Sequence, residues 1–204
     1  FSALSEDNWL AAAQGIMTTD TRPKTATACI DIDGQRIHVS GIAKGSGMIK
    51  PNMATMLSFV FTDAAIDNEV LNQLIKRVVD RSFNRITVDG DTSTNDCCML
   101  VATGKSGVSV RGGDVETLEK ITEMLQVVFQ ELATALIRDA EGASKFITLR
   151  VENGATPQEC LQVGYAVAES PLVKTAFFAS DPNWGRILAA VGRSGIEGLD
   201  IAGI

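Results

Sequence analysis

The 204-residue sequence lacks the features that would link it to a membrane or a nucleic acid. Its apolar runs, such as residues 56–61, fall far short of the roughly 20 residues that a membrane-spanning helix needs. It has no basic cluster, and 25 acidic against 18 basic residues give a formal net charge of −7. Because an acidic chain repels a phosphate backbone, we expect neither a membrane nor a nucleic acid as a partner.

Residues that bind metals are also scarce. His38 is the only histidine, and the four cysteines form no C-x-x-C pair, whereas a zinc site needs a tighter cluster of ligands. The neighbours Cys97 and Cys98 point to opposite faces if they lie on a strand, which is poor geometry for a disulfide between them. We therefore expect no metal, four free thiols and a reducing compartment, hence the cytoplasm.

Several motifs of nucleotide-binding proteins and hydrolases are incomplete or absent. The stretch Gly104-Lys-Ser106 resembles the end of a phosphate-binding loop, but Met99 stands where that motif needs a glycine. Gly45-Ser-Gly47 lacks the third glycine of a dinucleotide-binding fingerprint, and no G-x-S-x-G sequence is present. No cofactor is therefore expected.

The composition that remains is typical of a folded, soluble protein. Hydrophobic residues make up 45% and charged residues 21%, and the length allows one domain with a sizeable core or parts of two. The chain begins with Phe1 without a signal peptide and ends in an apolar stretch, residues 200–204. We interpret it as a fragment of a longer protein.

Strand patterns alternate with helix patterns along the chain. Asp33-Gly34 between two alternating runs predicts a hairpin, and the apolar run at 55–61 predicts a strand covered on both faces. The expected strands are 27–32, 35–42, 55–61, 97–103 and 146–152; the expected helices are 5–14, 67–83, 114–137, 156–168 and 183–191, with Ser5, Asp114 and Thr156 as caps, while 172–178 is ambiguous. This order predicts an α/β or α+β layered sandwich, with mixed sheets covered by helices.

One stretch indicates chemistry. A glycine-rich loop that carries Lys44 runs through small residues into Ala54-Thr55, at the start of a predicted strand. A threonine hydroxyl held over the preceding carbonyl can attack it, and hydrolysis of the resulting ester frees the threonine amine. That amine is then a base beside its own nucleophile, so no histidine is needed. The alternative is an ordinary glycine loop that leads into a buried strand.

Five stretches, in order, resemble the ornithine acetyltransferase (glutamate N-acetyltransferase) family. The processing site of that family is similar to Lys44-Gly-Ser-Gly-Met-Ile49 followed by Pro51-Asn-Met-Ala-Thr-Met-Leu57. The other matches are Gly15-Ile-Met-Thr-Thr-Asp-Thr21, Asp89-Gly-Asp-Thr-Ser-Thr-Asn-Asp96, Asp139-Ala-Glu-Gly-Ala143 and Asp181-Pro-Asn-Trp-Gly-Arg186. Together they span nearly all of the chain, which makes a joint chance match very improbable.

The resemblance implies a fold, a reaction and residue roles. It implies an N-terminal-threonine-nucleophile architecture, cut at Ala54-Thr55 into residues 1–54 and 55–204, whose two chains stay together and pair into a heterotetramer. It implies transfer of an acetyl group from N-acetylornithine to glutamate in arginine biosynthesis, through an acetyl-threonine on Thr55, with acetyl-CoA left open as a second donor. Thr21, Lys44 and Glu141 are the implied substrate contacts, because a lysine holds a carboxylate and a glutamate an ammonium.

Other interpretations stay open at this point. Thr21 fits a turn, Lys44 a solvated loop, and Glu141 a capping role. The acidic stretch 89–96 does not follow the calcium-loop spacing, which favours a structural or site-lining loop over a metal site. An aminopeptidase-like N-terminal-nucleophile hydrolase would use the same freed threonine. An inactive fragment is the third alternative, because the family's oxyanion threonine–glycine pair and its C-terminal substrate contacts lie outside this sequence.

Overall fold

The computed structural model describes residues 5–50, 56–93, 95–200 and 203–204. The chain divides into two compact units, Phe1–Glu141 and Gly142–Ile204. This boundary follows the packing of the chain and is separate from the predicted cleavage junction. Ala54 and Thr55 lie outside the described residues, so the predicted division at that junction stays a prediction.

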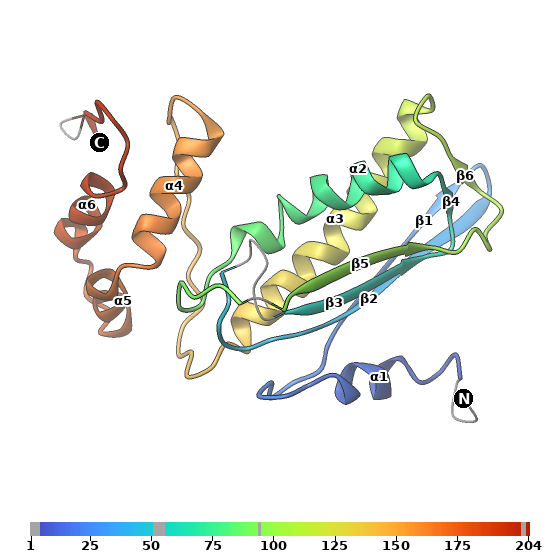
Figure 1. Ribbon diagram of the computed structural model, residues 1–204, viewed down its shortest axis with the longest axis horizontal. Coiled ribbons are helices and arrows are strands. Elements are labelled where there is room, and N and C mark those ends of the chain that lie inside the picture. The colour runs from blue at the N-terminus through green and yellow to red at the C-terminus, as the bar shows by residue number, and fades with distance from the viewer. Residues whose placement is uncertain (1–4, 51–55, 94, 201–202) are drawn as a thin grey trace. The chain divides into compact units, whose positions relative to one another are not determined.

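A mixed four-stranded sheet forms the centre of the first unit (Figure 1). Its order is β1-β2-β3-β5, and the strands are β1 (Lys24–Ile32), β2 (Gln35–Lys44), β3 (Leu57–Thr62) and β5 (Cys97–Ala102). β2 is antiparallel to both β1 and β3, whereas β3 and β5 are parallel. A short parallel pair that the sequence did not predict joins β4 (Ala65–Ile66) to β6 (Ser109–Val110). The mixed α/β class is therefore confirmed.

The predicted hairpin is confirmed in position and in turn geometry. Ile32 pairs with Gln35, so the connection between β1 and β2 has two residues. Asp33 and Gly34 have φ angles of 51° and 79°, the left-handed values that a type I′ turn requires at both positions. The twist of this turn matches that of the strands, which fixes the register of the hairpin along its whole length.

Two helices, α2 (Asn68–Val79) and α3 (Val115–Arg138), cover one face of the sheet, and α1 (Trp9–Gly15) lies against the other (Figure 1). A short 3₁₀ turn, η1 (Phe83–Arg85), follows α2. The face toward α3 forms a close-packed core of β-branched residues against a helix stripe, which includes the fully buried Val60, Leu125, Val128, Phe129 and Leu132. The Asp114 cap of α3 is confirmed, since its side chain accepts from the Thr117 amide. Within the described residues, no helix is both long and apolar enough to cross a bilayer.

Three expectations for this unit need correction. α1 begins at Trp9, and Ser5 does not cap it, because the Ser5 hydroxyl accepts from the Asp7 amide in a local turn before the helix. α2 ends at Val79, four residues before the predicted end. Alternate residues of β3 are fully buried against α3, but the opposite face is only half-buried, where the Trp9 ring contacts Phe61 edge-on at 5.5 Å between centroids.

The second unit packs three helices around a small apolar core. They are α4 (Pro157–Ala168), α5 (Pro171–Phe178) and α6 (Trp184–Gly192). The Thr156 cap and the first-turn proline of α4 are confirmed, because the Thr156 hydroxyl accepts from the Glu159 amide. The ambiguous segment 172–178 belongs to α5, which also begins with a proline. Val167, Val173, Ala190 and Val191 form the core.

The predicted strand at 146–152 is wrong. These residues have no regular structure, although Leu149 packs on the core of α4 to α6. Alternation of apolar and polar side chains indicates that one side of an extended segment packs against the protein. It does not supply the neighbouring strand that a ladder of hydrogen bonds needs.

Candidate functional site

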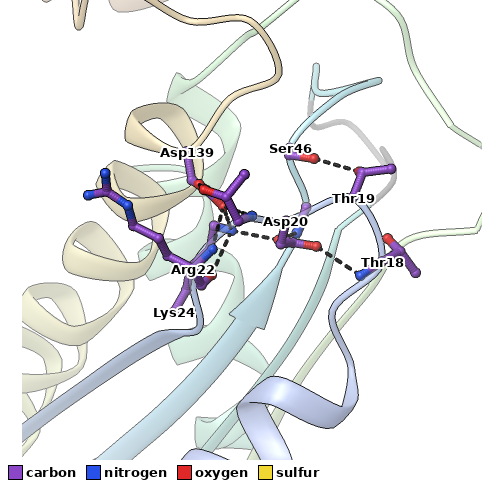
Figure 2. Close-up of polar contacts among 9 residues, drawn as sticks. Thr18, Thr19, Asp20, Arg22, Lys24, Ser46 and Asp139 are labelled. Atoms are coloured by element: carbon purple, nitrogen blue, oxygen red, sulfur yellow. Dashed lines mark hydrogen bonds and ion pairs between the residues drawn. The ribbon is translucent and has the colours of Figure 1, made fainter.

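A buried ammonium joins two carboxylates at one end of the first unit (Figure 2). The Lys24 Nζ atom lies 2.6 Å from Asp20 Oδ1 and 2.6 Å from Asp139 Oδ2. Lys24 is the first residue of β1, Asp20 lies in the loop before it, and Asp139 caps the C-terminus of α3. The three side chains are at most 6% exposed. The ion pairs therefore connect the start of the sheet to the end of its covering helix.

Both carboxyl groups are held in their ionised form. Burial raises the pKa of Asp139, but hydrogen bonds from Lys24 and Thr21 outweigh it and lower the pKa to about 2. Burial opposes the same change at Asp20, whose pKa is lowered by bonds from Lys24, Gly45 and Thr18. Two carboxylates thus share one ammonium at neutral pH, and backbone amides and a hydroxyl stabilise the excess negative charge.

Asp139 orients the predicted substrate residue Thr21. The Thr21 amide donates to Asp139 Oδ2 at 3.0 Å, and the Thr21 hydroxyl donates to Asp139 Oδ1. Since an ionised carboxylate can only accept, the hydroxyl of Thr21 must be the donor in this pair. Its oxygen lone pairs are then directed away from Asp139 and can accept a bond from a substrate.

The glycine loop after Lys44 is held from two sides. The Gly45 amide donates to Asp20 Oδ1 at 2.6 Å, and the Ser46 hydroxyl bonds Thr19 Oγ1 at 2.6 Å. On the other side, the Glu141 amide donates to the Ser46 carbonyl at 2.7 Å. A Cβ atom added at Gly47 would lie 2.8 Å from Glu141 Oε2, so a side chain there would displace the end of the Glu141 carboxylate.

The acidic stretch 89–96 contacts the chain on both sides of the predicted junction. Asp89 accepts from the Met48 amide at 2.6 Å and from the Ile49 amide at 3.1 Å. At the far end of the same stretch, Asp96 Oδ1 accepts from the Met56 amide at 2.6 Å. Across the described ranges, no three ligand side chains gather for a metal ion. These contacts agree with the expectation of a structural or site-lining loop.

The predicted substrate residues converge on the end of the sheet where β3 begins. Thr21 bonds Asp139, which precedes Glu141 by two residues, and Glu141 contacts the loop that follows Lys44. Lys44 is the last residue of β2 and pairs with Leu57, two residues after Thr55. Thr55 itself lies outside the described residues, although its neighbour Met56 is described.

The buried ion pairs were missed from the sequence because lysine and aspartate are usually solvated. One signal was present. Lys24 and Ala26 lie on the same side of an alternating strand, and both are buried. Extending the alternation of the predicted strand 27–32 backwards by two repeats, through Ala26, would have placed Lys24 inward. Nothing in the sequence indicated that Asp20 and Asp139, 119 positions apart, are its partners.

Comparisons with known proteins agree on one family. The ArgJ family matches residues 1–203. The chain is 56% identical over 202 residues to "Arginine biosynthesis bifunctional protein ArgJ" of Pseudomonas fluorescens, and 58% identical over 202 residues to the protein of the same name from Methylococcus capsulatus. These matches cover 98% and 99% of the chain but 50% of each relative, so the chain spans about half the length of the curated relatives it matches. The crystal structure of the Bacillus halodurans arginine biosynthesis bifunctional protein is similar with a TM-score of 0.63 and 40% identity, over 66% of this chain and 63% of that one.

Proposed function

Since the chain belongs to the ArgJ family, we propose that it carries the nucleophile and part of the substrate site of an acetyltransferase of arginine biosynthesis. Membership confirms the resemblance that the motifs indicated. The proposed reaction moves an acetyl group from N-acetylornithine to glutamate through an acetyl ester on Thr55. The enzyme acts in the cytoplasm, which suits its four free thiols.

The observation that carries the proposal is the convergence of three loops beside the start of β3. The loop before β1 brings Thr21, the glycine loop begins directly after Lys44 at the end of β2, and the turn after α3 brings Glu141. The hydrogen bonds described above tie these segments together. β3 itself starts two residues after Thr55. An amino-acid substrate has a carboxylate for Lys44 and an ammonium for Glu141, and Thr21 offers an oxygen acceptor.

The proposed maturation needs no protease. The Thr55 hydroxyl oxygen adds to the Ala54 carbonyl carbon, the amide nitrogen leaves with the proton, and an ester joins the two residues. Water then hydrolyses that ester, which releases the Ala54 carboxylate and restores the Thr55 hydroxyl beside a free amine. In the transfer reaction this amine takes the hydroxyl proton as the oxygen attacks the acetyl carbonyl.

Thr55→Ala tests this mechanism. Expressed from its complete natural gene, the wild-type protein should be cut into two chains, the second beginning Thr55-Met-Leu-Ser, and Thr55→Ala should stay intact and inactive. Intact mass and N-terminal sequencing measure the cut, and exchange of a labelled acetyl group measures transfer. Thr25→Ala, on the exposed side of β1, is the matched control and should behave as wild type.

Two results would contradict the proposal. A wild-type protein that stays intact yet transfers acetyl groups would rule out the freed amine as the base. Release of free acetate without transfer to glutamate would identify a hydrolase instead.

Two further measurements address the remaining parts of the proposal. Acetyl-CoA, supplied in place of N-acetylornithine in the same assay, tests the second donor. The mass of the native particle tests the proposed two-chain heterotetramer.

A further inference from the structure

Asp139 carries its negative charge where a helix disfavours one. It ends α3, and its amide donates to the Ala135 carbonyl at 3.1 Å, so the charge lies at the C-terminal end of the helix. Backbone dipoles give that end a partial negative charge, which favours a cation there. The side chain is also only 6% exposed, and burial opposes ionisation. The charge therefore does not stabilise the helix, and its role lies with the groups that its oxygens hold.

The carboxyl oxygens of Asp139 hold both polar donors of Thr21. Oδ2 accepts from the Thr21 amide at 3.0 Å and from the Arg22 amide at 3.3 Å, while Oδ1 accepts from the Thr21 hydroxyl. Bonds from the nitrogen and the hydroxyl of one residue to the same carboxylate select one staggered rotamer of its side chain. Thr21 is exposed, whereas the carboxylate is buried. The hydroxyl oxygen of Thr21 is therefore fixed in direction and accessible to a ligand.

The buried ion pairs extend this hold to a second loop. Lys24 Nζ lies 2.6 Å from Asp139 and 2.6 Å from Asp20 (Figure 2). Asp20 Oδ1 also accepts from the Gly45 amide at 2.6 Å. Asp139 thus sets the position of Thr21 relative to the glycine loop that follows β2.

The direction of these hydrogen bonds decides which substrate group Thr21 meets. N-acetylornithine offers a site its carboxylate, its side-chain ammonium, its acetyl carbonyl and its amide N–H. The proposed function assigns the carboxylate to Lys44 and the ammonium to Glu141. Because the Thr21 hydroxyl already donates its proton to Asp139, its oxygen can only accept, which excludes the acetyl carbonyl as its partner. The amide N–H is the donor that remains.

We propose that Asp139 is a positioning residue that fixes Thr21 as an acceptor for the N–H of the acetylated amine, so that the site recognises the nitrogen of the acetyl donor. This inference rests on the proposed function. When glutamate later attacks the acetyl group, the same oxygen accepts from its amine and orients that nitrogen. Neither Thr21 nor Asp139 gains or loses a proton.

The test compares two acetyl donors. One is N-acetylornithine, and the other is the acetyl ester of the corresponding hydroxy acid, in which an oxygen replaces the N–H. The protein is expressed from its complete natural gene, and formation of N-acetylglutamate is measured. Because an ester is intrinsically more reactive than an amide, the quantity compared between variants is the ratio of kcat/KM for the amide to kcat/KM for the ester.

Thr21→Val keeps the shape of the side chain but removes the accepting oxygen. We expect its kcat/KM to fall about tenfold for the amide and little for the ester, so that the ratio falls about tenfold. Asp139→Asn should shift the ratio in the same direction, because its amide group can donate to Thr21 and release the hydroxyl from its fixed role. The double variant should fall no further than Thr21→Val alone, since both changes act through one hydroxyl.

Two variants serve as controls. Thr21→Ser keeps the hydroxyl without the methyl group, and it should keep the wild-type ratio if Asp139 is what fixes the oxygen. Asp31→Asn removes an exposed carboxylate that pairs with Arg36 near the hairpin turn, and it should match wild type with both donors.

An unchanged ratio in Thr21→Val would overturn the inference. So would an Asp139→Asn variant in which kcat/KM falls equally for both donors, the result expected if Asp139 only stabilises the fold. If Asp139→Asn does not fold, Thr21→Ser decides, and a ratio as low as that of Thr21→Val would count against Asp139. A wild-type protein that forms no N-acetylglutamate contradicts the proposed function instead, whereas wild-type transfer with unmoved ratios contradicts the role of Asp139 alone.

Discussion

Replacement of Lys24 by methionine should destabilise the first unit more than any change at an exposed ion pair. Methionine keeps the length and apolar stem of lysine but removes the ammonium that Asp20 and Asp139 share. Two buried carboxylates are then left without their cation. Loss of one partner from a buried ion pair costs about 3–5 kcal/mol in the free energy of unfolding, a large part of the roughly 5–15 kcal/mol that holds a domain folded.

The pH dependence of stability should also change sign. In the wild type the pKa of Asp139 falls from its ordinary 3.8 to about 2 in the folded state. A lowered folded-state pKa stabilises the protein above pH 3.8, and that stabilisation disappears as the pH falls toward 2. This difference between the folded and unfolded pKa corresponds to roughly 2 kcal/mol of stability. In Lys24→Met, burial acts on both carboxyls without the ammonium, so protonation should stabilise the fold as the pH drops from neutral.

Urea unfolding of the purified protein, followed by circular dichroism between about pH 7 and pH 2, measures both effects. The control is Lys120→Met, because Lys120 pairs with Glu116 at 2.6 Å on an exposed face of α3. That variant should lose little stability, because an exposed ion pair is screened by water, and it should keep the wild-type pH dependence. Equal losses in the two variants, or a wild-type stability that stays flat down to about pH 2.5, would refute the assigned role of Lys24.

Two further predictions concern the substrate loops. Gly47→Ala should leave the melting temperature nearly unchanged, because the added Cβ comes close only to the end of the Glu141 side chain, at 2.8 Å. It should displace that carboxylate and so lower kcat/KM for N-acetylornithine. Unchanged kinetics would contradict the placement of Glu141. Lys44→Ala should raise KM for amino-acid substrates by about ten- to a hundredfold, the equivalent of a lost bond to a carboxylate of about 1.5–3 kcal/mol, with little effect on unfolding. An unchanged KM in steady-state assays would exclude Lys44 as the carboxylate contact.

The sequence predicted those elements that depend on neighbouring residues in the chain, such as turn residues, helix periodicity and helix caps. The hairpin followed from Asp33-Gly34, because only a few residue pairs accept two left-handed φ angles in succession. The helices at 115–138 and 157–168 followed from their periodicity and from the Asp114 and Thr156 caps. The strand expected at 146–152 failed because its stability depends on a partner that no local pattern specifies.

In the candidate site, likewise, some residues could be predicted from the sequence and others could not. The motifs indicated Thr21, Lys44 and Glu141, and the structure brings them toward one end of the sheet through Asp139 and Ser46. The residues that hold them there were not predicted, since a buried lysine between two aspartates is a tertiary arrangement. Thr55 stays a prediction, because the described residues end on either side of it.

The pairing of β2 with β3 bears on how the protein can be unfolded and recovered. The two strands lie on opposite sides of Ala54-Thr55, yet six registered residue pairs join them, from Val39 beside Thr62 to Lys44 beside Leu57. An uncut chain forms this pairing as a unimolecular event across a short loop. After a cut at the junction, the same pairing becomes an encounter between two molecules, at their bulk concentration rather than the millimolar effective concentration of a tethered pair. Recovery of the mature enzyme from denaturant should therefore depend on dilution, whereas uncut Thr55→Ala should refold at a rate independent of it. The persistence of the folded mature protein would then depend more on a slow rate of unfolding than on its free energy of unfolding.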